Sequence, residues 1–405
     1  MSHHSQYTPP VIQRHITKTL TTRLGEPRRF IQIVLGPRQV GKTTTVRQAL
    51  SAQATPCISV SADELTVIGP VWIAEHWERA RSAARASGSA ILAIDEIQKI
   101  SNWSETVKRL WDEDTASGTD VRVVLTGSST MLLRKGLSES LAGRFEVLRA
   151  THWQWVEMRE AFDCSFEDYL LFGGYPGPMS LRHDHERWLA YMRESIIEST
   201  LSLDVLQVER IDKPALLRNL LMLGTSLSGQ IVSLQKLLGQ LQDSGNAATI
   251  AHYLSLLSDS GMLAGLQKYT STMTRSKAAS PKLQVFAPAL MTAVIGVPHA
   301  THGHSPEQLG RLTESAIGAH LLSLTNGSLT TLQYWREGKH EVDFVLSAPG
   351  RCVLIEVKSG TVRNAYTGSI EFRKLHGPAK LYVVGGKEHM PVEEFLSATL
   401  SDLMS

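Results

Sequence analysis

The chain has 405 residues, of which 42% are hydrophobic and 20% are charged, a composition typical of folded globular proteins. Lysine and arginine number 41 against 39 acidic residues, so the net charge of +2 gives no whole-chain argument for binding nucleic acid or an anionic membrane. The three cysteines are far apart, which excludes a disulfide framework and a CxxC zinc site. With no signal-peptide core and no apolar run long enough to span a bilayer, we expect a soluble, cytoplasmic protein without membrane partners.

The first third of the chain alternates apolar runs with helical patterns. Helices are expected at residues 41–53 and 72–86, and strands at 30–36, 57–63, 90–96, 121–129 and 145–150. Strands that alternate with helices predict an α/β fold, in which a parallel sheet is covered by helices on both faces.

After residue 165 the pattern changes to helices and later returns to strands. We expect a helical lid or linker over residues 166–215. Within residues 216–280, the segment 227–269 reads as helix, a turn at 243–245, a second helix and a strand, an order that resembles a winged helix-turn-helix, and residues 270–280 read as a linker or wing tip. The remaining residues are expected to form a second α/β unit. The predicted domain limits are therefore 1–165, 166–215, 216–280 and 281–405.

A glycine-rich motif follows the first predicted strand. Residues 36–43 read GPRQVGKT, which fits GxxxxGK[ST], and a helix follows the motif as a phosphate-binding loop requires. The glycines let backbone N–H groups turn inward on phosphates, and the helix adds its positive N-terminal end. Lys42 is expected to reach the β- and γ-phosphates, and the Thr43 hydroxyl to ligate magnesium. The expected ATP-binding residues are Gly36, Pro37, Arg38, Gln39, Val40, Gly41, Lys42, Thr43 and Thr44.

Two carboxylates stand at the end of the third predicted strand. Asp95 and Glu96 follow the apolar run AILAI, at the carboxyl end of a strand, which is where ligands bind in open α/β sheets. Asp95 would hold magnesium, directly or through water, and Glu96 would orient and activate the attacking water. Alone, the pair could be surface carboxylates, but beside the phosphate loop it argues for hydrolysis of ATP. The expected cofactors are ATP and Mg²⁺.

Residues further along supply candidates for a sensor and for an arginine that acts across subunits. TGSS ends the fourth strand, so Ser128, or as a second choice Thr126, could contact the γ-phosphate or the water; a serine-rich helix cap is the alternative. Arg144 stands just before the fifth strand. It could enter a neighbouring subunit's ATP site and neutralise charge in the transition state, or it could form a surface ion pair.

The chain resembles the AAA-type ATPases of bacteria and archaea that carry a C-terminal domain of unknown function 4143. Five segments carry this resemblance: GPRQVGKTT, AIDEIQKI, LTGSS, LAGRF and FGGYPG. The similarity extends from about residue 12 to about residue 386. It implies an AAA+ core, with Ser128 at the sensor 1 position and Arg144 as the arginine finger, and a ring or other homo-oligomer. Relatives commonly have an aspartate where Ala287 stands, so the chain departs from the pattern there.

The C-terminal unit holds a second candidate site. Asp343 lies in one predicted strand, and Glu356 and Lys358 lie in the next, beyond a turn at residues 347–350. Because strand side chains alternate, Glu356 and Lys358 share one face, and in a hairpin Asp343 would lie near them. Two carboxylates and a lysine on one sheet face can bind magnesium and polarise a phosphodiester or activate water. An ordinary solvated strand face is the alternative.

These residues resemble the D…ExK core of the PD-(D/E)xK nuclease superfamily, and Glu314 on the preceding helix matches the acidic residue often found before it. The resemblance implies a nuclease-like domain, either active or degenerate. The expected fold class is thus α/β: a P-loop AAA+ parallel sheet with helices on both faces, a helical and winged-helix region, and a C-terminal α/β PD-(D/E)xK nuclease-like domain.

Charge limits what the helix-turn-helix region could do with DNA. The second helix would enter a major groove, yet no lysine or arginine occurs across residues 247–262. A structural or protein-docking role is therefore favoured over reading of DNA sequence.

Two functions fit the sequence. The first is an oligomeric ATPase motor or switch that controls a nuclease-like domain acting on DNA or RNA. The second is a regulatory ATPase with an inactive C-terminal domain that binds a partner. A small-molecule kinase fits less well, because nothing resembles a lid for an acceptor substrate.

Overall fold

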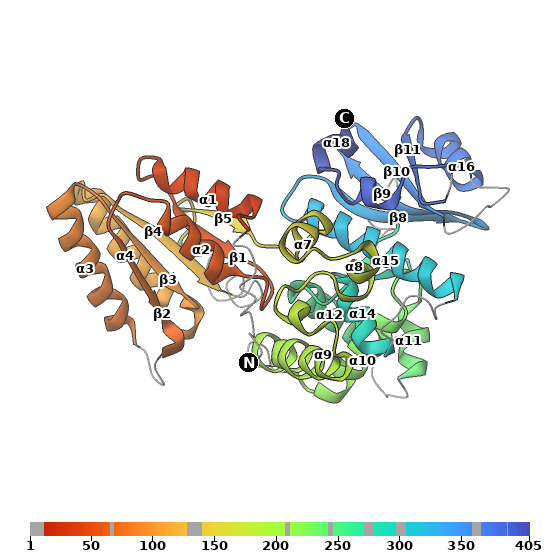
Figure 1. Ribbon diagram of the computed structural model, residues 1–405, viewed down its shortest axis with the longest axis horizontal. Helices are drawn as coiled ribbons and strands as arrows, with labels where there is room; N and C mark the ends of the chain where they lie inside the picture. The colour runs from red at the N-terminus through yellow and green to blue at the C-terminus, as the bar shows by residue number, and fades with distance from the viewer. Residues whose placement is uncertain are drawn as a thin grey trace, which may run out of the picture. The chain divides into compact units, whose positions relative to one another are not determined.

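The computed structural model describes residues 12–64, 69–127, 140–206, 211–241, 246–270, 279–296, 305–358, 366–386 and 388–405. The chain divides after Thr151 into an N-terminal unit, which runs from Val11 to Thr151, and a C-terminal unit, which runs from His152 to Ser405 (Figure 1).

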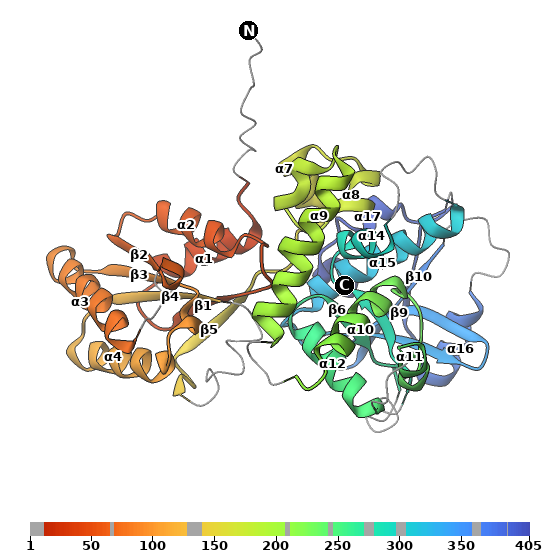
Figure 2. The ribbon, with the colours of Figure 1, turned by 90° about the horizontal axis from the view of Figure 1, so that it is seen from below.

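The N-terminal unit is built on a five-stranded sheet in the order β2-β3-β4-β1-β5, with neighbouring strands parallel. The strands are β1 (Ile31–Leu35), β2 (Cys57–Ser61), β3 (Ala90–Asp95), β4 (Val121–Gly127) and β5 (Phe145–Arg149). The helices are α1 (His15–Gly25), α2 (Lys42–Ser51), α3 (Pro70–Ser87) and α4 (Trp103–Ser117). Figure 2 shows α1 and α2 on one face of the sheet and α3 and α4 on the other.

Alternation along the buried strands explains why both faces are covered. On β1, Ile31, Ile33 and Leu35 join the core beneath α3 and α4, whereas Val34 joins the core beneath α1 and α2. A parallel strand buried on both faces needs this nearly continuous apolar sequence. The predicted parallel sheet with helices on both faces is therefore confirmed.

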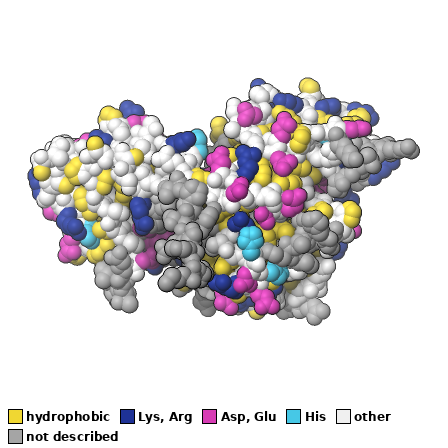
Figure 3. All heavy atoms as spheres, viewed as in Figure 1, with side chains coloured by type: hydrophobic (Ala, Val, Ile, Leu, Met, Phe, Trp, Pro, Cys, Tyr) yellow, Lys and Arg dark blue, Asp and Glu magenta, His cyan; other side chains and the backbone are white. Residues whose placement is uncertain are grey.

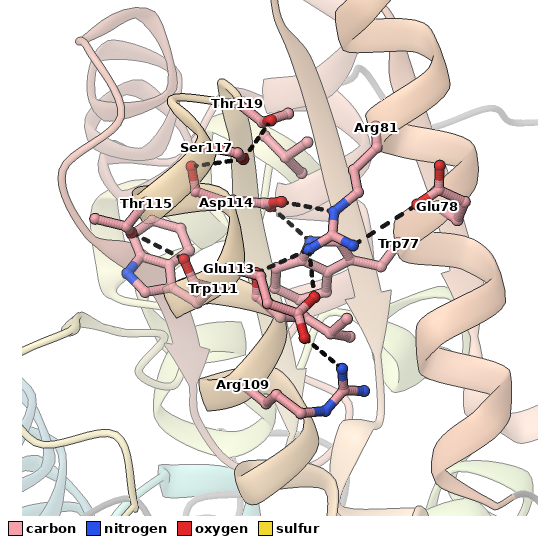
Figure 4. A network of polar contacts seen from close by, with 12 residues as sticks. Trp77, Glu78, Arg81, Arg109, Trp111, Glu113, Asp114, Thr115, Ser117 and Thr119 are labelled. Atoms are coloured by element: carbon pink, nitrogen blue, oxygen red, sulfur yellow. Dashed lines mark hydrogen bonds and ion pairs between the residues drawn. The ribbon is translucent and has the colours of Figure 1, made fainter.

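A buried carboxylate joins α3 to α4 (Figure 4). Asp114 is 1% exposed and accepts hydrogen bonds from Trp77 Nε1 at 2.7 Å and from Arg81 Nε at 2.6 Å. Arg81 also donates to Glu113, which in turn accepts from Arg109. Because Asp114, Trp77 Nε1 and the Arg81 guanidinium are all paired, the network fixes how the two helices pack without leaving an unpaired charge.

The C-terminal unit begins with helices. They are α7 (Trp155–Phe162), α8 (Phe166–Phe172), α9 (His185–Tyr191), α10 (Pro214–Ser226), α11 (Leu234–Gln240) and α12 (Ala247–Asp259), with turns of wider, π-type hydrogen bonding at Met192–Glu198 and Leu201–Leu206. Strands β6 (Leu263–Leu266) and β7 (Lys282–Val285) then pair antiparallel. Ile231, which precedes α11, forms an isolated bridge with Lys282.

The order of α11, α12 and β6 is the one predicted from the sequence. The predicted helices and the strand after them are present, and both α10 and α11 contact α12. Strand β7 pairs with β6 across the expected limit at residue 280. The limits expected at 165, 215 and 280 stay predictions, and the turn at 243–245 lies outside the described residues.

A second sheet closes the C-terminal unit. Its order is β11-β10-β9-β8, with β9 antiparallel to both β8 and β10, and β10 parallel to β11. The strands are β8 (Thr331–Glu337), β9 (His340–Ala348), β10 (Arg351–Val357) and β11 (Lys380–Val384). The helices of this part are α14 (Pro288–Ile295), α15 (Pro306–Thr325), α16 (Thr367–His376), α17 (Val392–Phe395) and α18 (Leu400–Met404). The predicted second α/β unit is therefore present, and its sheet is mixed.

Candidate nucleotide site and acidic centre

The phosphate loop lies between β1 and α2 and has a backbone that few sequences allow. Gln39 and Gly41 have positive φ values of 58° and 90°, and α2 begins at the next residue. A Cβ atom added at Gly36 would lie 2.1 Å from the carbonyl oxygen of Ala150, so only glycine fits there. The loop therefore turns tightly into the positive end of a helix, which is the arrangement that binds phosphate.

Lys42 is held against this loop. It is 6% exposed, and its ammonium donates to the carbonyl oxygens of Gly36 and Pro37, at 2.9 Å each. The charge therefore lies on the concave side of the loop, where it can meet a phosphate once a nucleotide is bound.

Thr43 and Asp95 come together at the start of α2. The Thr43 hydroxyl donates to Asp95 Oδ2 at 2.7 Å, although the two residues are 52 positions apart. Parallel strands put the carboxyl end of β3 at the same edge of the sheet as the loop that follows β1, with β4 between the two strands. A hydroxyl and a carboxylate at a phosphate loop are hard oxygen ligands, so the two side chains fit a magnesium ion.

Thr126 completes the polar edge of the sheet. Its hydroxyl donates to Asp95 Oδ1 and accepts the backbone N–H of Glu96 at 3.3 Å. Thr126 was the second choice for a sensor, and the structure places it against the Asp95 carboxylate and the backbone of Glu96. Ser128, the first choice, lies outside the described residues.

Gln98 is a contact that sequence reasoning did not identify. Its side-chain amide is buried and donates a hydrogen bond to Glu96 Oε2, while Glu96 itself has a positive φ of 52°. The signal was present as the glutamine in AIDEIQKI, two residues after the carboxylate. The contact fixes the direction of the Glu96 side chain.

Arg144 lies at the opposite edge of the same sheet. Its carbonyl oxygen accepts the N–H of Ile31, the first residue of β1, whereas the phosphate loop follows the last. Its guanidinium donates to both oxygens of Asp112, at 2.7 and 3.0 Å. These hydrogen bonds hold the pKa of Asp112 below its ordinary value. Arg144 therefore forms an ion pair within its own unit, away from its own phosphate loop.

Arg14 connects the phosphate loop to the end of the N-terminal unit. This buried side chain donates to the carbonyl oxygen of Val40 in the loop and to that of Thr151, at 3.0 Å each. Sequence reasoning did not identify Arg14, because the residue lies upstream of every motif.

In the C-terminal unit, β9 and β10 form the predicted hairpin and bring three predicted residues together. Ile355 pairs with Phe344, so Asp343 and Glu356 stand at the next step of the ladder. Asp343 Oδ2 accepts the N–H of Val357 at 2.7 Å, and Lys358 Nζ lies 3.1 Å from Glu356 Oε2. Glu356 is itself buried, and this burial raises its pKa.

The fourth predicted residue, Glu314 on α15, contacts a lysine that the sequence did not indicate. Lys282 Nζ lies 2.6 Å from Glu314 Oε1 and 3.8 Å from Asp343 Oδ1. Over the described ranges, no group of three or more histidine, cysteine, aspartate or glutamate side chains is arranged to hold a metal ion. A magnesium ion bound by Glu314, Asp343 and Glu356 therefore does not fit this arrangement, because an ammonium already lies between two of the three carboxylates.

Ala287 and the FGGYPG segment have a structural explanation. Ala287 is the N-cap residue of α14, and a Cβ atom at Gly174 (φ 110°) would lie 2.4 Å from its methyl group. The carbonyl oxygen of Gly173 accepts the N–H of Ala289. The segment thus packs its glycine backbone against the start of α14. An aspartate at 287 would cap this helix, and alanine cannot.

Figure 3 shows basic and acidic side chains interspersed over the face it draws, in keeping with the near balance of formal charge. Among the residues that the structure describes, no helix combines the length and the apolarity that crossing a membrane requires.

Comparison with protein families divides the chain into three matched regions. Residues 28–159 match the model of an AAA domain, residues 164–301 match a domain of unknown function (DUF8612), and residues 309–401 match another (DUF4143). The N-terminal unit is therefore an AAA domain with a P-loop, followed by two domains whose functions are unknown. The search of curated proteins found no match.

Solved structures give weak similarity at low sequence identity. The Orc1 protein of Aeropyrum pernix in complex with DNA is 14% identical, with 72% of this chain and 94% of that chain covered and a TM-score of 0.33. The RuvB Holliday junction branch migration motor of Thermotoga maritima is 19% identical, with 66% and 94% covered and a TM-score of 0.32. AMPPCP-bound DnaA from Aquifex aeolicus is 16% identical, with 60% and 86% covered and a TM-score of 0.32. TM-scores of this size carry no argument about function.

Proposed function

We propose that this chain hydrolyses ATP in the presence of magnesium and works as an oligomeric switch or motor. The observation that carries the proposal is the 2.7 Å contact between the Thr43 hydroxyl and Asp95 Oδ2 at the end of the phosphate loop. Bound magnesium would neutralise charge on the β- and γ-phosphates. Thr43 and Asp95 are the two side chains that would hold it.

The neighbouring residues have separate roles in this proposal. The backbone of Gly36 to Thr44 and the Lys42 ammonium bind the phosphates. Glu96 accepts a proton from the attacking water, or orients that water, and Gln98 holds the carboxylate in position. Thr126 links Asp95 to the backbone of Glu96, so it acts as the sensor within the described residues, and Ser128 stays a candidate for the same role.

Assembly is proposed from the position of Arg144. Its location at the starting edge of the strands keeps it away from its own phosphate loop, so it can act as an arginine finger only on the ATP of a second copy. In that role the guanidinium would leave Asp112 and stabilise charge on the transferred phosphoryl group.

The test of ATP hydrolysis compares Thr43→Ala and Asp95→Asn with Ser51→Ala, a change on the same helix as Thr43 but at its exposed C-terminal end. Phosphate release by the first two variants should fall at least about tenfold at saturating Mg²⁺, since each removes a metal ligand. Ser51→Ala should match the parent. Unchanged release by both ligand variants would show that the contact is not part of the site.

Two functions are proposed for the C-terminal domain. The first is a nuclease-like domain that acts on DNA or RNA, supported by the closeness of Asp343, Glu356 and Lys358 on one hairpin. The second is an inactive domain that binds a partner protein, supported by the Lys282 ammonium between two of the acids. The region from α10 to β7 would then serve docking, because α12 carries no lysine or arginine.

A cleavage assay separates the nuclease from the inactive domain. The purified protein is incubated with single- and double-stranded DNA and RNA, with Mg²⁺ or Mn²⁺ and with or without ATP. Cleavage that disappears in Glu356→Ala, while ATP hydrolysis survives, would establish the nuclease. No cleavage, with ATP hydrolysis intact, would establish the regulatory ATPase with an inactive domain.

A further inference from the structure

Lys282 is a lysine with no exposed surface. It begins strand β7, and its exposed fraction is 0%. Lysine is almost never fully buried in proteins unless its charge is paired, because removing an ammonium from water costs several kcal/mol before any partner is counted. The position therefore calls for a specific set of partners.

Four oxygen or aromatic contacts surround the ammonium. Lys282 Nζ lies 2.6 Å from Glu314 Oε1 and 3.8 Å from Asp343 Oδ1, and it donates to the backbone carbonyl oxygen of Asp343 at 3.1 Å. The ring of Phe344 lies beneath it, with its centroid 4.7 Å away. The ammonium thus joins three elements, β7, α15 and β9, within one unit.

Packing holds Glu314 in place for this contact. Gly229 has a φ of 85°, and a Cβ atom there would lie 3.3 Å from the Glu314 carboxyl carbon. At the next residue of α15, Ser315 Oγ lies 2.9 Å from Ser228 Oγ. The segment at 228–229 therefore presses the carboxylate toward the lysine, and the ion pair is a built feature of the fold.

The electrostatic balance favours a charged lysine. Burial alone would lower the pKa of Lys282, but the Glu314 and Asp343 carboxylates outweigh this effect and raise its pKa above the ordinary lysine value. Glu341 also contributes to this rise. The ammonium therefore stays protonated throughout the physiological range.

A divalent metal bound by the same two carboxylates would lie next to this ammonium. Hard cations bind carboxylate oxygens at about 2.0–2.6 Å, so an ion shared by Glu314 and Asp343 would stand within a few ångströms of Nζ. Like charges at that distance repel strongly in a site of low dielectric constant. Lysine and metal are therefore alternatives for the same two side chains.

We propose that Lys282 is the built-in cation of this acidic centre: its ammonium neutralises Glu314 and Asp343 from inside the fold and thereby keeps a divalent metal from binding the pair.

Calorimetric titration with Mn²⁺ tests the proposal on the full-length, nucleotide-free protein. All variants carry Asp95→Asn, which removes the carboxylate of the phosphate-loop site. Lys282→Met should bind Mn²⁺ at least about tenfold more tightly than the parent, because two carboxylates lose their internal cation. The gain should disappear in Lys282→Met/Glu314→Gln. Lys268→Met, which removes a lysine paired with Glu337 in the same unit, should bind as the parent does.

Thermal unfolding keeps the test decisive if Lys282→Met binds no metal because it folds poorly. Removing one partner of a buried pair leaves the other charge uncompensated, so Lys282→Met should lower the Tm by several degrees. Lys282→Met/Glu314→Gln should recover part of that loss, since the stranded carboxylate is gone. The proposal is overturned if the double variant is no more stable than Lys282→Met, if the parent binds Mn²⁺ as tightly as Lys282→Met, or if the gain persists without Glu314.

Discussion

The Arg144 guanidinium donates two hydrogen bonds to the Asp112 carboxylate, at 2.7 and 3.0 Å, across the start of the sheet and away from the phosphate loop of its own subunit. If Arg144 serves a neighbouring ATP site, this pair must open on assembly. The pair is part-exposed, so opening it takes little free energy.

Arg144→Ala should lower the rate of ATP hydrolysis by about 10³-fold, the usual contribution of an arginine that acts across subunits. Mixing Arg144→Ala with Lys42→Ala should restore activity that neither variant has alone, because one supplies an intact phosphate loop and the other an intact finger. Arg109→Ala, which removes a surface arginine paired with Glu113, serves as the control and should change nothing. Failure of the mixture to regain activity would remove Arg144 from the neighbour's site.

Gln98→Leu should lower kcat for ATP hydrolysis several-fold and leave nucleotide binding unchanged. The buried amide donates to Glu96 Oε2, so its loss frees the carboxylate that orients the water. Single-turnover hydrolysis and binding of a fluorescent ATP analogue separate the two effects. Lys99→Ala is the matched control, since Lys99 is exposed and pairs with Asp63 instead. A rise in the dissociation constant without a change in kcat would assign Gln98 to binding.

The stability of the C-terminal unit should fall at mildly acidic pH through His320. This imidazole is 2% exposed, and burial lowers its pKa from 6.5 to about 4. A depressed histidine pKa means that the unfolded chain takes up the proton first. The free energy of unfolding is therefore unaffected by His320 above pH 6.5, and it falls by about 3 kcal/mol as the pH drops from there toward 4.

Denaturant unfolding of the parent and of His320→Gln between pH 7.5 and 4.5 checks this expectation. The variant should lose less stability on acidification than the parent, because it has no proton to gain. Exposed His15, replaced by glutamine, gives the matched control. Parallel pH profiles for the parent and His320→Gln would contradict the assignment.

Asp114 and Glu113 provide a matched pair for the network between α3 and α4. Both accept hydrogen bonds from Arg81, but Asp114 is 1% exposed whereas the Glu113 side chain is 44% exposed. Asp114→Asn should lower the free energy of unfolding by about 2–3 kcal/mol, since Arg81 loses its buried partner. Glu113→Gln should cost less than about 1 kcal/mol. Equal losses on chemical denaturation would refute the role given to burial.

Local patterns were enough to predict the sheet and the phosphate loop. The apolar runs before Gly36 and Asp95 indicate buried strands, and in a parallel sheet both strands end at one edge. Thr43 meets Asp95 because the strand order puts only β4 between β1 and β3, and the sequence patterns do not give that order. The hairpin that brings Asp343 to Glu356 follows from the short turn between the two strands.

Contacts made by residues without a motif could not be predicted from the sequence. Lys282 meets Glu314 and Asp343 only after β7, α15 and β9 have packed together, and a lone lysine in an apolar run gives no sign of its partners. Gln98 was visible in a motif, but its direction depends on the positive φ of Glu96, which has no signature in the sequence.

The two hydrogen bonds of Arg14 connect the phosphate loop to the last residue of the N-terminal unit. One ends on Val40, inside the phosphate loop, and the other on Thr151, the last residue before the polypeptide enters the C-terminal unit. A rotation of the Val40 peptide would therefore act on the exit of the chain through this side chain, in addition to the close approach of the Ala150 backbone to Gly36. The last residue of the N-terminal unit is thus tied to the loop proposed to bind ATP, so a change in that loop would reach the end of the unit within one side chain's length.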